Sequence, residues 1–328
     1  MKFQLLLRAG SALVALPLVS PFSFPSSFTS TPIDGSTTPI YRDARQRWPR
    51  QGEDKLAVIT YCYDDHATQA RLAPVMRKAI QIWYDELGGP ASKASGHGLV
   101  FKEYGAPASK SPWCLQNGKL WTAESGIPMD AVRVHANDRA KAVSTVGYIE
   151  DDGAETGGRH EMRLDPHTAV EGAWVFAHEL GHVLGLLHEH QRVDRENYVN
   201  FKCANVQGFH ETQTVSFEQN PSEDANSICT NYSVAQRYGF DAMQYIPEDN
   251  HFQTDASPTF DFNSIMLYDS KTFAELRESC NAGSTDYCVL LKWTSPAKER
   301  LEYIDTNKVP SEGDVEFVKS FYNWQGRD

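Results

Sequence analysis

The eleven residues 178–188 read HELGHVLGLLH and have the form HExxHxxGxxH, which constrains this chain more than any other feature. His178 and His182 are four residues apart, so on a helix both rings project from the same face. Glu179 lies one position further round, which suits contact with a metal-bound water rather than with the metal. The segment must therefore be a helix whose end allows the chain to turn back and offer His188 as a third ligand.

The apolar pattern around this motif predicts a mostly buried helix over residues 173–187. The residues that carry the pattern are Trp174, Val175, Phe176, Leu180, Val183, Leu184 and Leu187. Gly185 stands where the helix must stop, because glycine tolerates the left-handed backbone that ends many helices.

Three protein ligands and one water make an open, catalytic zinc site, whereas structural zinc sites are closed by four protein ligands and are often rich in thiolates. We therefore expect one zinc ion bound by His178, His182 and His188. Zinc lowers the pKa of a bound water to about 7. Glu179 can then act as general base and pass the proton to a leaving amine. The motif predicts hydrolysis of an amide through a zinc-activated water.

The residues around and beyond the motif resemble the astacin family of metzincin peptidases. That family's signature continues as HExxHxxGxxHExxRxDRD, and here residues 189–196 read EHQRVDRE, so that only Glu196 departs from it. Residues 261–268, DFNSIMLY, resemble the family's Met-turn with its Ser-x-Met-x-Tyr core. Residues 310–322 resemble its C-terminal helix. With weaker likenesses at Trp48-Pro49 and Ser144–Gly147, the resemblance runs roughly from Trp48 to the C-terminus.

This resemblance implies the same zinc ligands and the same general base. It further implies that Met266 forms an apolar floor under the site without binding metal, although an ordinary core methionine is the plain alternative. Tyr268 would be a displaceable zinc ligand that moves on substrate binding and stabilises the oxyanion, and a buried aromatic is its plain alternative. Glu189 would form a structural link to the N-terminus of the mature protein.

The fold class implied by the resemblance is α+β, with a two-lobed, zincin-like catalytic domain at residues 46–328. The N-terminal lobe (46–188) would hold a twisted mixed sheet and the active-site helix. The C-terminal lobe (189–328) would be mostly irregular and end in a helix.

Periodicity within the chain predicts a helix over residues 72–87, stopped by Gly88-Gly89-Pro90. The predicted strands are 56–61, 99–104, 131–135, 144–150 and 161–164. Residues 144–147 would belong to an edge strand that pairs with an extended peptide. The polar span 203–259 is interpreted as a loop region, tied by Cys203 and Cys229.

Six cysteines and an apolar N-terminus indicate a secreted, extracellular protein. Residues 1–20 resemble a signal peptide, and residues 21–45 a pro-segment or disordered leader. If the protein is a zymogen, Asp34 could occupy the open position of the zinc, with a simple Asp-Gly turn as the alternative. Asn231-Tyr232-Ser233 is a glycosylation sequon. Proximity favours three disulfides, although fifteen pairings are possible: Cys62–Cys114, Cys203–Cys229 and Cys280–Cys288.

The net charge of −12 argues against nucleic-acid or anionic-membrane partners. No segment beyond the leader is long and apolar enough to span a membrane. The expected partners are protein or peptide substrates, and the oligomeric state stays open. The remaining histidines have no ligand spacing and are interpreted mostly as surface or loop residues: His66, His97, His135, His160, His167, His190, His210 and His251.

The main alternative to a peptidase is a catalytically inactive relative that binds peptides or matrix. The intact Glu179 and Tyr268 favour an enzyme, because a purely binding protein has no need of the base. Glu189 and the Met-turn sequence argue against another zincin clan. A small secreted effector would explain the cysteines but not the histidine constellation.

Overall fold

The computed structural model describes residues 42–43, 47–105, 110–136, 142–151, 153, 155–166, 172–247, 254–255 and 259–326. All of these residues belong to one compact unit, residues 36–328. The expected signal peptide and Asp34 lie outside the described residues and stay predictions. Within the described part, no helix has the length and apolarity needed to cross a membrane.

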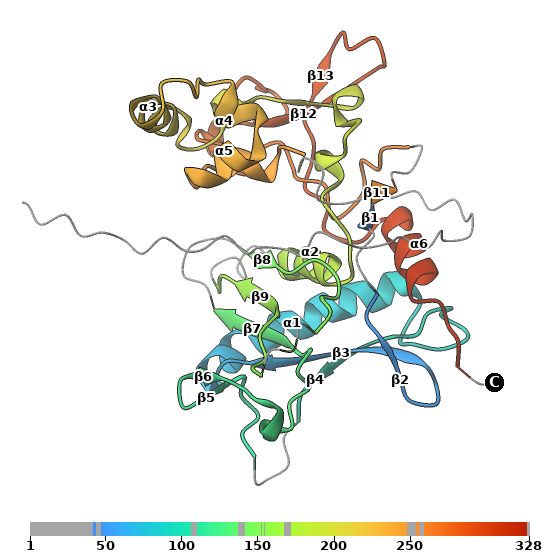
Figure 1. Ribbon diagram of the computed structural model, residues 1–328. Helices are drawn as coiled ribbons and strands as arrows, with labels where there is room; N and C mark the ends of the chain where they lie inside the picture. The colour runs from blue at the N-terminus through green and yellow to red at the C-terminus, as the bar shows by residue number, and fades with distance from the viewer. Residues whose placement is uncertain are drawn as a thin grey trace, which may run out of the picture. The chain divides into compact units, whose positions relative to one another are not determined.

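A six-stranded mixed sheet forms the framework beneath the histidine motif (Figure 1). Its strands are β2 (Arg50–Gln51), β3 (Leu56–Tyr63), β4 (Leu99–Glu103), β7 (Val132–Ala136), β8 (Val143–Ser144) and β9 (His160–Leu164). The order is β2-β3-β7-β9-β8, with β4 also paired to β3. The pairs β3–β4, β3–β7 and β7–β9 are parallel, whereas β2–β3 and β8–β9 are antiparallel. The short strand β8 therefore lies at one edge of the sheet.

The strand predicted over residues 144–150 is shorter than expected, because only Val143–Ser144 pairs regularly. At Gly147 the backbone adopts φ 61°, and its N–H donates to the His182 carbonyl at 2.9 Å. A chain that turns toward the zinc-motif helix in this way cannot continue the β-ladder.

Helices α1 (His66–Leu87) and α2 (Ala173–Val183) pack against each other, and α1 also packs against β3 and β7. The Asp65 side chain caps the start of α1 by accepting from the Thr68 N–H. The helix ends at Gly88, which has the left-handed φ of 83° that the sequence predicted. Trp83 is fully buried and donates from Nε1 to the Ala177 carbonyl in α2 at 2.8 Å. This bond joins the predicted core helix to the motif helix.

Residues from the C-terminal end of the chain complete this first core. Ile265 and Met266 lie in it together with Phe317 and Phe321 of α6 (Glu312–Phe321). Ser311 begins α6 with a reciprocal capping box, in which its own hydroxyl and the residue 314 carboxylate satisfy backbone donors. The predicted C-terminal helix is therefore present, and it packs on the same core as the motif helix.

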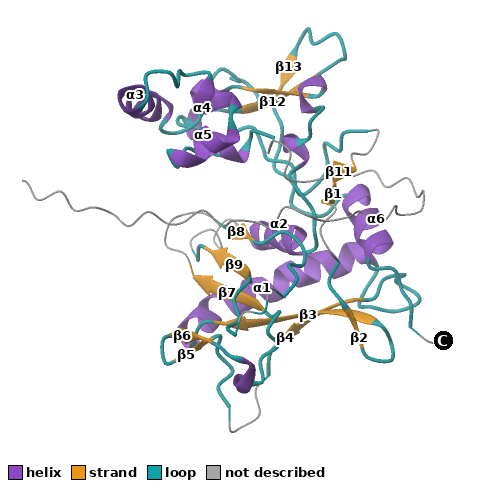
Figure 2. Cartoon of the chain, viewed as in Figure 1, coloured by secondary structure: helices purple, strands orange, loops and turns teal. Residues whose placement is uncertain are grey.

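Residues 203–259 were expected from their polarity to be a loop region, but the described residues 203–247 contain three helices. These are α3 (Phe209–Gln219), α4 (Ser227–Thr230) and α5 (Tyr232–Arg237), followed by a 3₁₀ turn η6 (Asp241–Gln244). They belong to a second core that includes Ile228, Ala235 and Tyr245. Helices α4 and α5 are short, and α3 has few apolar residues, so the helical period is not visible in the sequence. Figure 2 shows these helices among the loops that follow α2.

A three-stranded sheet lies beside this second core. It consists of β10 (Val199–Phe201), β12 (Leu290–Trp293) and β13 (Leu301–Glu302), all antiparallel. Two further pairs are short: β1 (Arg42–Asp43) with β11 (Thr254–Asp255), and β5 (Leu115–Gln116) with β6 (Lys119–Leu120). The other 3₁₀ turns are Ala123–Ser125, Glu189–Gln191, Arg195–Asn197, Cys203–Asn205 and Arg277–Ser279. The predicted α+β class, with its mixed sheet and C-terminal helix, is confirmed.

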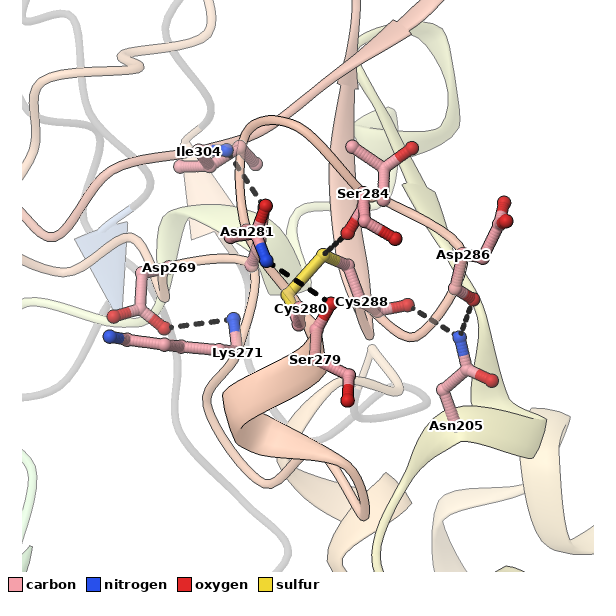
Figure 3. The surroundings of a disulfide bond; sticks show 12 residues. Asn205, Asp269, Lys271, Ser279, Cys280, Asn281, Ser284, Asp286, Cys288 and Ile304 are labelled. Carbon is pink, nitrogen blue, oxygen red and sulfur yellow. Dashed lines mark hydrogen bonds between the residues drawn. A yellow bond between two sulfur atoms is a disulfide. The ribbon is translucent and has the colours of Figure 1, made fainter.

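All three disulfides join the cysteines that proximity favoured, namely Cys62–Cys114, Cys203–Cys229 and Cys280–Cys288. Figure 3 shows the surroundings of Cys280–Cys288. The amide of Asn205 donates to the backbone carbonyls of Asp286 (2.7 Å) and Cys288 (2.8 Å). The smallest disulfide loop is thereby attached to the turn that contains Cys203.

His160, at the start of β9, is a buried histidine whose charge state should affect stability. Its ring lies against Trp48 and Tyr148, with centroids 4.6 and 5.2 Å away. Its Nε2 accepts from the Ile149 N–H at 2.7 Å. Burial, followed by the nearby Arg159 charge, lowers the pKa of His160 to about 3. The folded protein therefore holds this imidazole neutral.

A group with a depressed pKa in the folded state contributes stability above its unfolded pKa, about 6.5 for histidine, and loses it as the pH falls. Lowering the pH from 6.5 to 5 should therefore reduce the free energy of unfolding of the parent by about 2 kcal/mol more than that of His160→Asn. Denaturant titrations at several pH values measure this difference. His210→Asn, at an exposed site, should follow the parent, and equal pH slopes for the parent and His160→Asn would contradict the assignment.

Candidate active site

Helix α2 carries His178 and His182 on its buried surface, and both rings are oriented by backbone carbonyls. His178 Nδ1 donates to Ile265 O at 2.7 Å, and His182 Nδ1 donates to Leu186 O at 2.9 Å. Because a carbonyl oxygen can only accept, the proton of each ring must lie on Nδ1. Each Nε2 therefore presents a lone pair to the space beside the helix.

The chain turns sharply after α2 and returns the third histidine to the same place. Gly185 adopts φ 103°, a conformation that side chains rarely tolerate. His188 then donates from Nδ1 to the Oε1 atom of Gln191 at 2.7 Å. Its Nε2 lies 3.2 Å from that of His178 and 3.1 Å from that of His182. The predicted turn at Gly185 therefore brings the three predicted ligands together.

The three Nε2 atoms have no proton between them, so their lone pairs repel unless a cation lies at the centre. Zinc–nitrogen bonds of about 2.0–2.1 Å in tetrahedral geometry separate the nitrogens by about 3.3 Å, close to the distances found. Among the described residues, this is the group of histidines, cysteines and acids that could hold a metal ion. The donor set of three imidazoles, with no thiolate, fits a zinc ion with an open position.

Burial also keeps these imidazoles in the neutral form that binds metal. It lowers the pKa of His178 to about 4. The pKa of His188 is lowered well below its usual value by burial and then by the neighbouring histidines. Desolvation disfavours the charged imidazolium, so the site resists protonation under ordinary conditions.

Glu179 is buried next to the first ligand on α2 and has a carboxylate suited to proton transfer. Burial raises its pKa to about 7, and the Ser144 hydroxyl on the edge strand β8 opposes that shift. Its Oε2 atom is buried and has no hydrogen-bond partner among the described residues. A carboxyl group whose pKa lies near neutrality can both accept and donate a proton at the same pH.

Met266 lies under the motif helix, as the resemblance implied. It is fully buried in the first core. A Cβ atom added at Gly181, in the middle of HELGH, would lie 2.5 Å from the Met266 sulfur. Gly181 is therefore required for the close approach of the Met-turn to α2. This glycine had no predicted role, although a glycine inside a buried helix is a signal of close packing.

Tyr268, two residues further on, lies beside the histidine cluster. Its ring centroid is 4.5 Å from that of His188 and 5.8 Å from that of His178. Burial and the Glu179 charge raise its pKa. The hydroxyl therefore keeps its proton and can donate a hydrogen bond.

Glu189 is completely buried directly after the third ligand. Its Oε1 atom accepts from the Asp261 N–H (2.9 Å) and from the Arg192 guanidinium (3.2 Å). Its Oε2 atom is buried and has no hydrogen-bond partner among the described residues. Burial raises the pKa of this carboxyl to about 8. The predicted link to a mature N-terminus stays a prediction.

Three of the remaining histidines, which were interpreted mostly as surface or loop residues, do not lie at the surface. His97, His160 and His190 are all buried, while His167 and His251 lie outside the described residues. The ring of His190 stacks on that of His188, with centroids 4.9 Å apart. A histidine without ligand spacing gives no sequence signal for such a position.

Part of the chain is similar to known zinc peptidases. The family model Astacin (Peptidase family M12A) matches residues 128–250. The zinc metalloproteinase nas-31 of Caenorhabditis elegans is 29% identical over 130 residues, 37% of this chain and 20% of that protein. The zinc metalloproteinase nas-5 of the same organism is 34% identical over 98 residues, 30% of this chain and 19% of that protein. The match thus spans about a fifth of each nematode protein.

High choriolytic enzyme 2 of Oryzias latipes is 27% identical over 177 residues, 52% of this chain and 60% of that protein. Among solved structures, high choriolytic enzyme 1 of the same fish aligns with a TM-score of 0.46 at 16% identity, covering 85% of this chain and 95% of that chain.

The contact between Gly181 and Met266 predicts the effect of one added methyl group. Gly181→Ala should lower the free energy of unfolding by about 1–3 kcal/mol, because a well-packed core resists added volume. Thermal or denaturant unfolding measures the change. Gly105→Ala is the control, since nothing lies within 4 Å of its added Cβ. In a Met266→Ala background the cost should shrink, and an equal cost in both backgrounds would exclude the contact as its cause.

Proposed function

We propose that this chain, whose residues 128–250 match the family model Astacin (Peptidase family M12A), is a secreted zinc endopeptidase that cleaves peptide bonds in proteins. The observation that carries the proposal is the convergence of three neutral imidazoles at 3.1–3.2 Å. A cation stabilises such a cluster, and three nitrogen ligands leave a zinc position open for chemistry. The printed names of the nematode relatives, zinc metalloproteinases, agree with it.

In the proposed reaction, His178, His182 and His188 hold the zinc ion. When bound, zinc supplies Lewis-acid polarisation and lowers the pKa of a water ligand to about 7. Glu179 takes a proton on a carboxylate oxygen and delivers it to the leaving amine. Tyr268 donates from its hydroxyl to the substrate oxygen as negative charge develops there.

We propose that substrate binds in extended form along strand β8. This strand ends the order of the main sheet and pairs with β9 on one side. An edge strand can bind a peptide through its main chain. Ser144 on β8 also lies close enough to Glu179 to affect its pKa, so a peptide on this edge would pass beside the proposed base.

Secretion and processing belong to the same proposal. Three disulfides are typical of proteins that fold in an oxidising compartment. Residues 1–20 would be the signal peptide and residues 21–45 a pro-segment or disordered leader. In a pro-segment, Asp34 would be the group that blocks the zinc. Removal of that segment would let the new amino terminus reach Oε2 of Glu189, which has no hydrogen-bond partner in the described part of the chain. Residues 46–188 and 189–328 would be the two lobes of the mature domain.

Glu179→Gln tests the general base. General-base catalysis contributes about 10²–10⁴-fold to a rate. The rate of casein hydrolysis by the purified variant should therefore be at least about 100-fold lower than that of the parent. Both proteins are assayed before and after limited proteolysis of the leader. Metal analysis should still find one zinc per chain, since this side chain is not a ligand. Glu218→Gln, at an exposed position, should keep parent activity. Full activity of Glu179→Gln would show that Glu179 is not the general base. A folded parent protein that contains no zinc would refute the proposed zinc peptidase function.

Tyr268→Phe tests the proposed hydrogen-bond donor. Loss of one donor to a developing oxyanion costs about 10²–10³-fold in kcat, while KM should change little because ground-state contacts persist. Steady-state kinetics on a peptide substrate separate the two constants. Tyr287→Phe, which removes a hydroxyl from a residue that is 45% exposed, is the control. An unchanged kcat for Tyr268→Phe would show that another group stabilises the charge.

A further inference from the structure

Four consecutive backbone carbonyls, those of residues 243–246, accept hydrogen bonds from side chains that directly follow the zinc motif. The amide nitrogen of Gln191 donates to the first (3.2 Å) and to the last (2.9 Å). Nε2 of His190 donates to the second at 2.9 Å. The guanidinium of Arg195 donates to the third. We call these four acceptors the 243–246 carbonyl group.

Two of these side chains also contact the candidate active site. Gln191 accepts from His188 Nδ1 through Oε1 at 2.7 Å, and His190 accepts from the Tyr268 N–H at 3.3 Å. The orientation of the Gln191 amide is determined, since two carbonyls can face only its nitrogen. Its oxygen must then face His188. The side chain thus bridges a proposed zinc ligand and a segment more than fifty residues away.

The residues that supply the 243–246 carbonyl group are anchored in the second core. Tyr245 and Ile246 are buried there with Ala242, and the N–H groups of residues 245 and 246 both donate to the Ala242 carbonyl. The turn η6, which contains Ala242 and ends directly before Tyr245, packs against α4 and α5. The position of the Gln191 amide therefore depends on the folding of the helical segment 209–246.

We propose that Gln191 is a positioning residue, through which the helical segment 209–246 orients His188 and sets the affinity for zinc. The inference rests on the proposed function only in requiring that the three histidines bind zinc. Partners of the non-ligating nitrogen hold a metal-binding imidazole in one tautomer and one orientation, and their loss typically weakens metal binding by about 10–100-fold. Among the described residues, Gln191 occupies that position for His188.

Gln191→Leu tests this role, because leucine fills a similar volume but can neither accept from His188 nor donate to the carbonyl group. In the metal-free full chain, titration with Zn²⁺ against a competing chelator should show affinity about 10–100-fold weaker than in the parent. The visible spectrum of the Co²⁺-loaded protein should change as well, because it reports ligand geometry. Neither measurement depends on activity.

Val234→Ala is the matched control, because it removes volume from the same second core but leaves Gln191 in place. It should lower the melting temperature without weakening zinc binding to the folded protein. If Val234→Ala weakens zinc binding as much as Gln191→Leu, the effect is general destabilisation and the inference fails. Parent-like zinc affinity in Gln191→Leu also overturns it.

Coupling between the sites is reciprocal, so zinc binding should slow hydrogen exchange at the amides of residues 245 and 246 in the parent. That slowing should be lost in Gln191→Leu, and its persistence would contradict the bridge. If the parent binds no zinc, the proposed function fails and the inference fails with it. If the parent binds zinc and Gln191→Leu binds it equally well, the inference fails alone.

Discussion

The mutual approach of three imidazole lone pairs is the constraint on which the rest of the site depends. Nε2 atoms at 3.1–3.2 Å repel one another unless a cation is bound, so the fold must hold each ring in place from its far side. It does so with one acceptor for each Nδ1, and these acceptors come from different parts of the chain: Ile265 O, Leu186 O and Gln191 Oε1.

Each acceptor is in turn held by a separate structural unit. The N–H of Ile265 donates to the buried carboxylate of Asp314 at 2.8 Å, which connects the ring of His178 to the start of α6. The carbonyl of Leu186 is placed by the left-handed turn at the end of α2. Gln191 is held by the carbonyls of residues 243 and 246. Helix α6, the turn after α2 and the second core thus contribute one constraint each, which makes the metal centre a property of the whole folded unit.

The features that sequence predicted are those whose cause is local. Helical spacing and the glycine at position 185 act over short stretches of chain, and each disulfide joins two cysteines that are consecutive in the cysteine order, although Cys62 and Cys114 lie 52 residues apart. The roles of His190 and Gln191 were missed because their partners lie more than fifty residues away. The helices within 209–237 were missed because they are stabilised by a shared core rather than by a periodic apolar face of their own.

The single departure from the astacin signature also follows from burial. Arg192 is fully buried and Arg195 nearly so, and both donate to groups within the fold. Asp194 accepts from Arg192 through both carboxylate oxygens. Glu196, where the signature has aspartate, is exposed. An extra methylene there displaces no neighbour, whereas the same change at Asp194 would push the carboxylate into the guanidinium that also holds Glu189. The position that differs is therefore the one where packing imposes the weakest constraint.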